Sequence, residues 1–435
     1  MIARKQASIL RISIGAALGA AFLFLGFINQ AQAAMTLDEC FNLALKQNES
    51  LKIKEEDIKA AEARYKQALG GILPNLNFLL TETFQDTSRI HSQPAVPILR
   101  ESTVSNFQLK QPLFKGLKEF SAMSGFKHQS KSFDLAYRRA VADLYLDVAQ
   151  AFYQVAGLET AVNNLDVLIK LTVERVTELN NRAKLGKSRE SEILTAESQV
   201  YALKSTRAQT VGNLTAAREL LGFFAGQDLS ATPLDYQLRI EEEFMPLDQA
   251  LEKGEERYDL KAERETVEVQ RFAVRASKAD YWPTLDATAD YYTKRKGLLA
   301  KVDWDVLLDL DVPIYQGGAV QGRVREAMSG YSQAKLQYEQ MDRQVKSDVK
   351  TSHAQLLAVI EAAKTLSDAY TKAKRSYELQ VREYRLGLVN NLDVLQAMNS
   401  MQQLKQNLDG STLNTQLGVI NLQAAIDALP FETNK

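Results

Sequence analysis

Cysteine, histidine and proline are scarce in this chain of 435 residues. Cys40 is the single cysteine, so no internal disulfide can form and the fold must be held by packing or assembly. The three histidines, His91, His128 and His353, lie far apart in unlike contexts, and neither an HExxH nor a GxSxG motif is present. We therefore expect no enzyme, no cofactor and no metal site, and a buried structural role for Cys40.

A long apolar run is also missing from everything beyond the N-terminus. Three basic residues precede an apolar stretch at about 14–28, and Ala31-Gln32-Ala33 fits a small-x-small cleavage pattern. We interpret residues 1–33 as an export signal; the alternative, a membrane anchor, would need a longer stretch. Without residues 1–33 the chain has 50 basic and 54 acidic residues, a balance that does not indicate nucleic-acid binding.

The rest of the sequence repeats itself. Residues 111–116 (QPLFKG) recur as 312–317 (VPIYQG), an offset of 201, whereas Leu73-Pro74 matches Trp282-Pro283 at an offset of 209. The shared offsets predict two structural repeats, at 34–235 and 236–435. In each repeat we expect a short helix, a helix, two strands joined by a loop, a very long helix, a tight turn and a returning helix.

The very long helices should run from about Gly116 to Leu185 and from about Gly317 to Leu386. Neither segment contains proline, and apolar residues recur at spacings of three and four, as in a coiled-coil seam. At about 1.5 Å per residue each helix would be about 100 Å long, so it must pack side by side with others in a bundle, fibre or tube. Gly186 and Gly387 suit left-handed C-terminal caps at the two hairpin turns.

Between the helices the apolar period changes to two. In residues 302–312, Val302, Trp304 and Val306 alternate with aspartates, and residues 284–291 alternate similarly. Such segments of about 10 residues are typical of a membrane β-barrel, although a soluble sheet covering a core has the same pattern. Four strands cannot close a barrel in lipid, whereas three chains would supply about 12.

The polar face of these strands is acidic. We expect it to create a negative field in the lumen that favours cations, or else only to solvate the lumen wall. The carboxylates concerned are Asp286, Asp290, Asp303, Asp305, Asp309 and Asp311.

Several short motifs together resemble a known family over essentially the whole mature sequence. They are Thr36-Leu37-Asp38-Glu39 leading to Ala44-Leu45, Leu73-Pro74, Gln111-Pro112-Leu113-Phe114, Leu185-Gly186, Leu386-Gly387 and Asp393-Val394-Leu395. With the repeat, the long helices and the export signal, they make the chain similar to the TolC-like outer-membrane efflux proteins.

The resemblance implies a mainly α fold with a membrane β-barrel portion. It implies a homotrimer with a 12-stranded barrel in the outer membrane, in contact with its lipid, above a periplasmic α-helical tunnel. Such a duct passes substrates of tripartite efflux or type I secretion and docks a periplasmic adaptor (membrane fusion) protein and an inner-membrane pump or secretion transporter. The two Leu-Gly hairpin turns would be the docking points.

The resemblance also implies a gate at the tunnel tip. Tyr384 matches a tyrosine at the family's constriction, and Asp393 matches an acid whose three copies ring the entrance. Glu192 is the counterpart of Asp393 in the first repeat, with Ser191 beside it. Both acids could equally be helix N-terminal residues that favour the helix dipole.

Two positions depart from the family pattern. Val389 stands where the family's prototype has an arginine bonded to the neighbouring hairpin, and Gln396 replaces a second acidic residue. We therefore expect a closed state without that latch and with one acidic ring. The rival hypothesis, a soluble periplasmic coiled-coil adaptor without a barrel, leaves the four alternating strands unexplained.

Overall fold

The computed structural model describes residues 34–86, 100–240, 244–296 and 299–430. The predicted export signal lies outside the described residues. The elements follow one order twice and are α1 (Leu37–Gln47), α2 (Glu49–Gly70), β1 (Asn75–Phe84), β2 (Glu101–Lys115), α3 (Lys118–Lys184), α4 (Glu190–Ala225), α5 (Leu247–Gly254), α6 (Tyr258–Lys278), a 3-10 turn (Ala279–Tyr281), β3 (Thr284–Lys294), β4 (Trp304–Asp311), α7 (Ala319–Leu386) and α8 (Asn391–Ala425).

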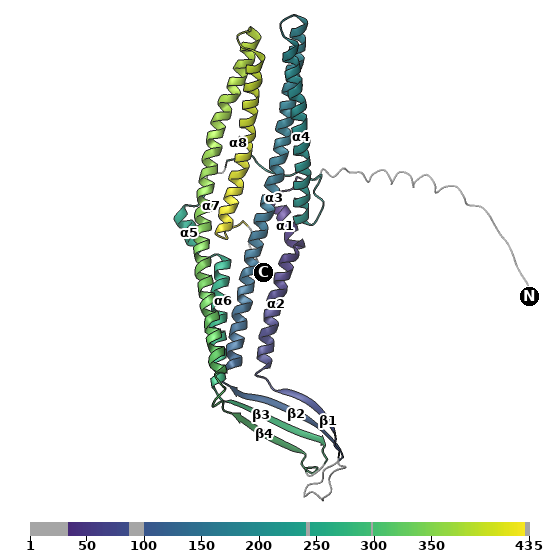
Figure 1. The fold of residues 1–435 in the computed structure, drawn as a ribbon, viewed down its shortest axis with the longest axis vertical. Coiled ribbons are helices and arrows are strands. Elements are labelled where there is room, and N and C mark those ends of the chain that lie inside the picture. Colours follow the sequence, from purple (N-terminus) through teal and green to yellow (C-terminus); the bar gives the residue numbers. More distant parts are fainter. Residues whose placement is uncertain (1–33, 87–99, 241–243, 297–298, 431–435) are drawn as a thin grey trace, which may run out of the picture.

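The molecule is a long helical body with a sheet at one end (Figure 1). The long helices α3 and α7 have 67 and 68 residues and run its whole length, as the heptad spacing predicts. In the half nearer the sheet they lie beside α2 and α6, and in the other half they form hairpins with α4 and α8. The mainly α architecture predicted from the sequence is confirmed.

The chain changes direction sharply where strands meet helices. Gly116 has a φ of +62°, and a side-chain carbon there would lie 2.6 Å from the carbonyl oxygen of Ala279. Gly317 and Gly318 also have positive φ values, of 59° and 84°, just before α7. Because glycine adopts this conformation without a steric penalty, the two repeats can turn from strand to helix at equivalent positions.

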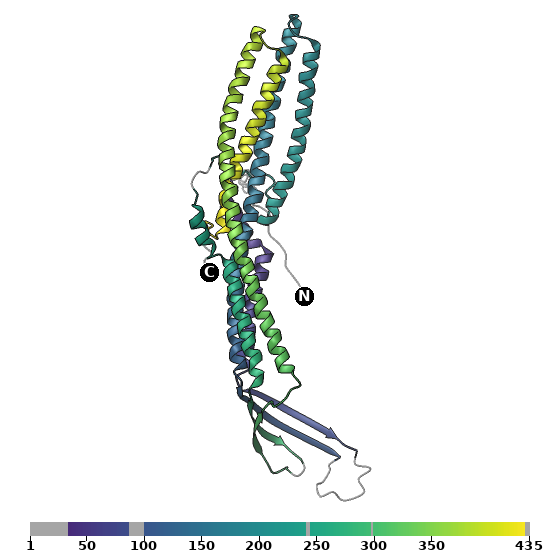
Figure 2. The same cartoon turned by 60° about the vertical axis from the view of Figure 1, so that its left-hand side comes forward.

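The four strands form one antiparallel sheet in the order β1-β2-β3-β4, so β1 and β4 are its free edges. Its apolar face is bare: Leu76, Phe78, Val306, Leu308 and Leu310 are each 57–68% exposed. Phe78 and Phe107 pair on that face with ring centroids 5.1 Å apart. The sheet therefore covers no core within the described chain, and it extends away from the helices at an angle (Figure 2).

The main core lies at mid-length, where α1 packs against α3 and α4. Cys40 is 0% exposed there, among neighbours that include Phe41, Tyr145 and Phe152. Burial, with a smaller contribution from Glu39, raises the pKa of the Cys40 thiol to about 12. The thiol is therefore mostly protonated at neutral pH, and its burial is as expected from the sequence.

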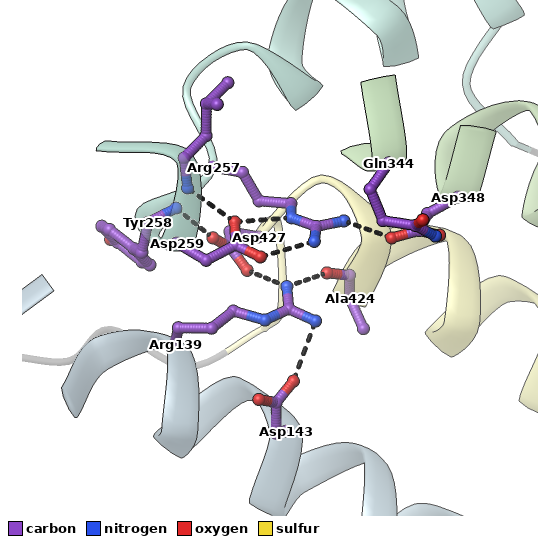
Figure 3. Close-up of polar contacts among 10 residues, drawn as sticks. Arg139, Asp143, Arg257, Tyr258, Asp259, Gln344, Asp348, Ala424 and Asp427 are labelled. Carbon is purple, nitrogen blue, oxygen red and sulfur yellow. Dashed lines mark hydrogen bonds and ion pairs between the residues drawn. The ribbon is translucent and has the colours of Figure 1, made fainter. Parts of the chain in front are cut away.

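A network of ion pairs joins the second repeat to the first at the level of this core (Figure 3). Arg139 of α3 contacts Asp427, just beyond α8, at 2.8 Å, and Asp427 also accepts the backbone N–H of Tyr258 at 2.6 Å. Arg257, 4% exposed, contacts Asp259 at 2.5 Å and Asp348 of α7 at 3.1 Å. Four helices, α3, α6, α7 and α8, are thus joined through a few charges.

Candidate functional site

The two hairpin turns form the end of the molecule opposite the sheet. Gly186 and Gly387 have φ values of 70° and 77°, so both left-handed caps are as predicted. The Gly387 N–H donates to the Tyr384 carbonyl oxygen at 3.0 Å, which closes the last turn of α7. Leu185 and Leu386 are 70% and 75% exposed at the two tips. They are accessible to a partner, and their role in adaptor docking stays a prediction.

Tyr384 lies in the last turn of α7 and is only 5% exposed. Its ring faces the first hairpin, with the guanidinium carbons of Arg175 and Arg182 at 3.7 and 4.5 Å from its centroid. Leu179 and Val394 pack against it in a small apolar cluster. Tyr384, the predicted constriction residue, thus joins the two hairpins of one chain through cation-π contacts.

Arg175 is the centre of this contact, and the sequence reasoning missed it. Its side chain is 6% exposed; Nε donates to Oδ1 of Asn391 at 2.8 Å, and Nη1 donates to Glu178 at 2.8 Å. Its position in the heptad pattern of α3 could have indicated burial, because Leu168, Thr172, Arg175 and Leu179 follow one another at heptad spacing and are all buried. An arginine in an apolar seam needs partners, and here Asn391 and Tyr384 of the second hairpin supply two of them, in addition to Glu178 on its own helix.

Asp393 and Glu192 sit at equivalent places in the first turns of α8 and α4. Asp393 accepts the Asn390 N–H at 2.9 Å, and Asn390 in return accepts the Asp393 N–H at 3.0 Å. Glu192 accepts Oγ–H of Ser188 at 2.6 Å and, at 3.4 Å, the N–H of Arg189. Both acids therefore stabilise helix N-termini, a role compatible with an acidic ring.

The remaining predicted gate residues make fewer contacts. Val389 is half-buried in the apolar cluster around Tyr384 and brings no charge to it. Ser191 and Gln396 are exposed on α4 and α8. The polar contacts between the two hairpins come from α3 rather than from the position of Val389: Arg175 donates to Asn391, and Glu178 lies 3.9 Å from Arg385 of α7.

The sheet brings the predicted acidic residues together. Asp286 lies directly opposite Asp309, Asp290 opposite Asp305, and Asp311 opposite Thr284. Asp303 is the exception: β4 begins at Trp304, so Asp303 immediately precedes the strand instead of belonging to it.

Polar and basic neighbours offset part of this acidity. Asn106 and Gln108 donate to Asp290 at 2.5 and 3.2 Å. Lys110 lies 3.8 Å from Asp286, and Arg295 lies 3.4 Å from Asp305. Carboxylates directly opposite one another repel, so these partners stabilise the pairing and make the face less negative than the aspartates alone suggest.

The described residues hold no cluster of three or more potential metal-ligating side chains. Among those same residues, no helix combines the length and the apolarity that a membrane span requires.

A sheet with a bare apolar face, joined to two helices of 67 and 68 residues that are each about 100 Å long, defines the class of envelope channels with a periplasmic tunnel. The model of the family described as "Outer membrane efflux protein" matches residues 40–227 and 248–427. The chain belongs to that family.

The relatives agree with this assignment. The outer membrane protein TolC of Escherichia coli is 23% identical over 427 residues, covering 93% of this chain and 84% of that protein. The proteases secretion protein PrtF of Dickeya chrysanthemi is 22% identical, covering 84% and 82%. The Campylobacter jejuni CmeC outer membrane channel has the same fold, with a TM-score of 0.79 at 16% identity over 98% of this chain and 94% of that one. The chain is therefore an outer-membrane exit duct that extends into the periplasm.

Proposed function

We propose that three copies of this chain form the exit duct of a tripartite efflux or type I secretion system, acting as a conduit and not as an enzyme. The bare apolar face of a sheet with two unpaired edges carries the proposal. Unpaired strand edges cost several kcal/mol per group in lipid, and the homotrimer removes them by closing a 12-stranded barrel. Substrates would come from an inner-membrane pump or secretion transporter through a periplasmic adaptor.

Cell fractionation tests this proposal against the soluble-adaptor alternative. We expect the mature chain in the outer membrane as a heat-labile, detergent-resistant trimer. Release of the chain as a soluble monomer when the periplasm is emptied would reject the duct.

The contact between Tyr384 and Arg175 is proposed as the tie that keeps the tunnel tip closed. It joins the two hairpins inside one chain, at the level where the acidic N-termini of α4 and α8 lie. Arg175→Met should remove the closer of the two cation-π contacts to Tyr384 and the Asn391 hydrogen bond, and so raise single-channel conductance in planar bilayers. Arg375→Met, at an exposed arginine on α7, is the matched control. Equal conductance of Arg175→Met and the control would reject the tie.

Two acidic sites are proposed to favour cations. Asp393 would do so at the tunnel entrance, and the aspartates of the sheet would do so in the barrel lumen. Asp393→Asn should change conductance and ion selectivity, and the parent channel should have a cation-favouring reversal potential. An Asp393→Asn channel with unchanged values would reject the first site, and an anion-favouring parent would reject the second.

The exposed tips are proposed as the adaptor contact. Leu386→Ser replaces an exposed apolar side chain beside the Gly387 cap, so the trimer should form normally while adaptor cross-linking in cells falls. Unchanged cross-linking in a double variant, Leu185→Ser with Leu386→Ser, would place the contact elsewhere.

A further inference from the structure

A cavity of about 660 Å³ lies between α3 and α6, which run side by side in the half of the helical body nearer the sheet (Figure 1). The two helices belong to different repeats, so the cavity is shared between the repeats. Most of the side chains that line it are charged. The basic ones are Lys131, Lys261, Arg264 and Arg271, and the acidic ones are Glu265 and Glu268. Four cations against two carboxylates leave two positive charges unbalanced.

The basic residues of α6 share one face of that helix. Lys261, Arg264, Arg271, Arg275 and Lys278 follow one another at spacings of three, seven, four and three, which keep to one side of a helix. The chain as a whole has 53 basic and 54 acidic residues. The positive face of α6 is therefore a local feature and not a consequence of the overall composition.

Both carboxylates of the cavity already have basic partners. Glu265 lies 2.6 Å from the Lys131 ammonium and 2.6 Å from Nδ1 of His128, and Glu268 pairs with Arg271. Burial alone would raise the pKa of Glu265, but the contacts with Lys131 and His128 outweigh it and lower that pKa. Glu265 therefore stays ionised and holds α3 and α6 together, so it does not neutralise the remaining cations.

Two of the cations have little or no compensation. Arg264 is exposed and makes no hydrogen bond or ion pair with any residue in the described ranges. Lys261 pairs at 2.5 Å with Glu256, whose side chain is 75% exposed and lies outside the cavity lining. Such an exposed pair is weak, because water competes for both charges. Lys261 and Arg264 are therefore available to an anion from solution.

We propose that this cavity binds an anion with two or more phosphate groups, held by Lys261, Arg264 and Arg271. Lys261 and Arg271 are ten residues apart, about 15 Å along the helix, so one phosphate group cannot contact both ends of the site. A phosphate group presents three acceptor oxygens and close to two charges, and the planar guanidinium of arginine can bind it with two hydrogen bonds. A duct needs no ligand of this kind, so the site is an additional property of the chain.

The position of the cavity keeps it accessible. α2 packs against α3, α3 against α6, and α6 against α7, so the cavity lies at the middle of this row of helices. Further copies of the chain would pack against the ends of the row, at α2 and α7, and would leave the middle uncovered. The side chains of Lys131 and Arg271 are 64% and 43% exposed, so a ligand can reach the site.

Isothermal titration calorimetry of the detergent-purified protein with tripolyphosphate, at low ionic strength, tests the site. Lys261→Gln/Arg264→Gln should weaken binding by about tenfold, because each exposed charge contact typically changes affinity several-fold. Lys372→Gln/Lys374→Gln, at exposed lysines of α7 outside the cavity, removes the same charge and should bind like the parent. Inorganic phosphate should bind more weakly than tripolyphosphate, and the affinity for tripolyphosphate should fall as salt is added.

Native mass spectrometry of the protein extracted from outer membranes distinguishes two sources of the phosphate groups. A lipid-sized adduct that the parent retains and Lys261→Gln/Arg264→Gln loses supports the site and identifies a lipid headgroup. Tripolyphosphate binding without such an adduct supports the site and identifies a soluble ligand. Equal tripolyphosphate affinities of the two double variants overturn the site. A parent that neither binds tripolyphosphate nor retains an adduct overturns it as well.

Discussion

The two repeats have the same element order but are held together differently at mid-length. In the first, α1 packs on α3 and α4 through a large apolar cluster that includes Cys40 and Tyr145. In the second, the apolar cluster around α5 is smaller, and the buried charges of Arg257 and Asp427, with the partly exposed Asp348, complete the closure. Apolar cores tolerate repacking, whereas a buried charge depends on its partner. The second repeat should therefore be the more easily disrupted of the two.

The largest effect is expected at Arg257. Arg257→Met leaves Asp259 and Asp348 without their cation, and removing one partner of a buried pair typically costs about 3–5 kcal/mol. Denaturant unfolding of the purified protein measures the loss. Arg207→Met, which breaks an exposed pair with Asp166, is the control and should leave stability nearly unchanged. Equal effects of the two variants would remove the contrast between the repeats.

A cavity in the smaller core should have the next largest effect. Leu356 is 0% exposed, and Leu356→Ala should cost about 2–5 kcal/mol. A side-chain carbon at Gly418 would lie 3.1 Å from Cδ1 of Leu356, so Gly418→Ala should recover part of that loss in the Leu356→Ala background. The double variant, measured in the same unfolding assay, contradicts this packing if it is less stable than Leu356→Ala.

The hairpin tips allow a smaller comparison between the repeats. Asn390 caps α8 with its side chain, whereas the side chain of Arg189 makes no such hydrogen bond at the start of α4, which has only the Glu192 carboxylate. Asn390→Ala should cost about 1 kcal/mol and speed hydrogen exchange in the first turn of α8. Ser188→Ala, which removes only the hydroxyl contact to Glu192, should change exchange in α4 less. A larger change in exchange for Ser188→Ala than for Asn390→Ala would show that the tips are capped differently in solution.

The smallest effect concerns pH. Burial raises the pKa of Asp427 above its ordinary value, although the Tyr258 N–H and Arg139 act in the opposite direction. Between the unfolded and the folded pKa of Asp427, the folded chain therefore binds more protons than the unfolded chain. The stability that this carboxyl contributes falls as pH rises through that range. The stability of the parent relative to Asp427→Asn should decline from about pH 3.8 upward and then level off. A difference that increases with pH would have the wrong sign.

Long-range regularity was predictable from sequence, and individual side-chain partners were not. The offsets of 201 and 209 locate the starts of α7 and β3 because each repeat is one structural unit. Heptad spacing predicts α3 and α7 because a long helix needs a continuous apolar seam.

Contacts between remote segments fall outside such patterns. Arg175 meets Tyr384, and Arg139 meets Asp427, across more than 200 residues of sequence, so no local period reports either contact. Lys110 and Arg295, which offset two of the sheet's aspartates, were missed for a related reason. Alternation assigns a face to each residue without showing which residue lies opposite.

The proposed duct contains three copies of this chain, and the mass of the complex extracted from outer membranes measures that number. Native mass spectrometry in detergent should give three copies of the mature chain, converting to single chains on heating. A single chain in mild detergent, or protein recovered only from the soluble periplasmic fraction, would contradict the account.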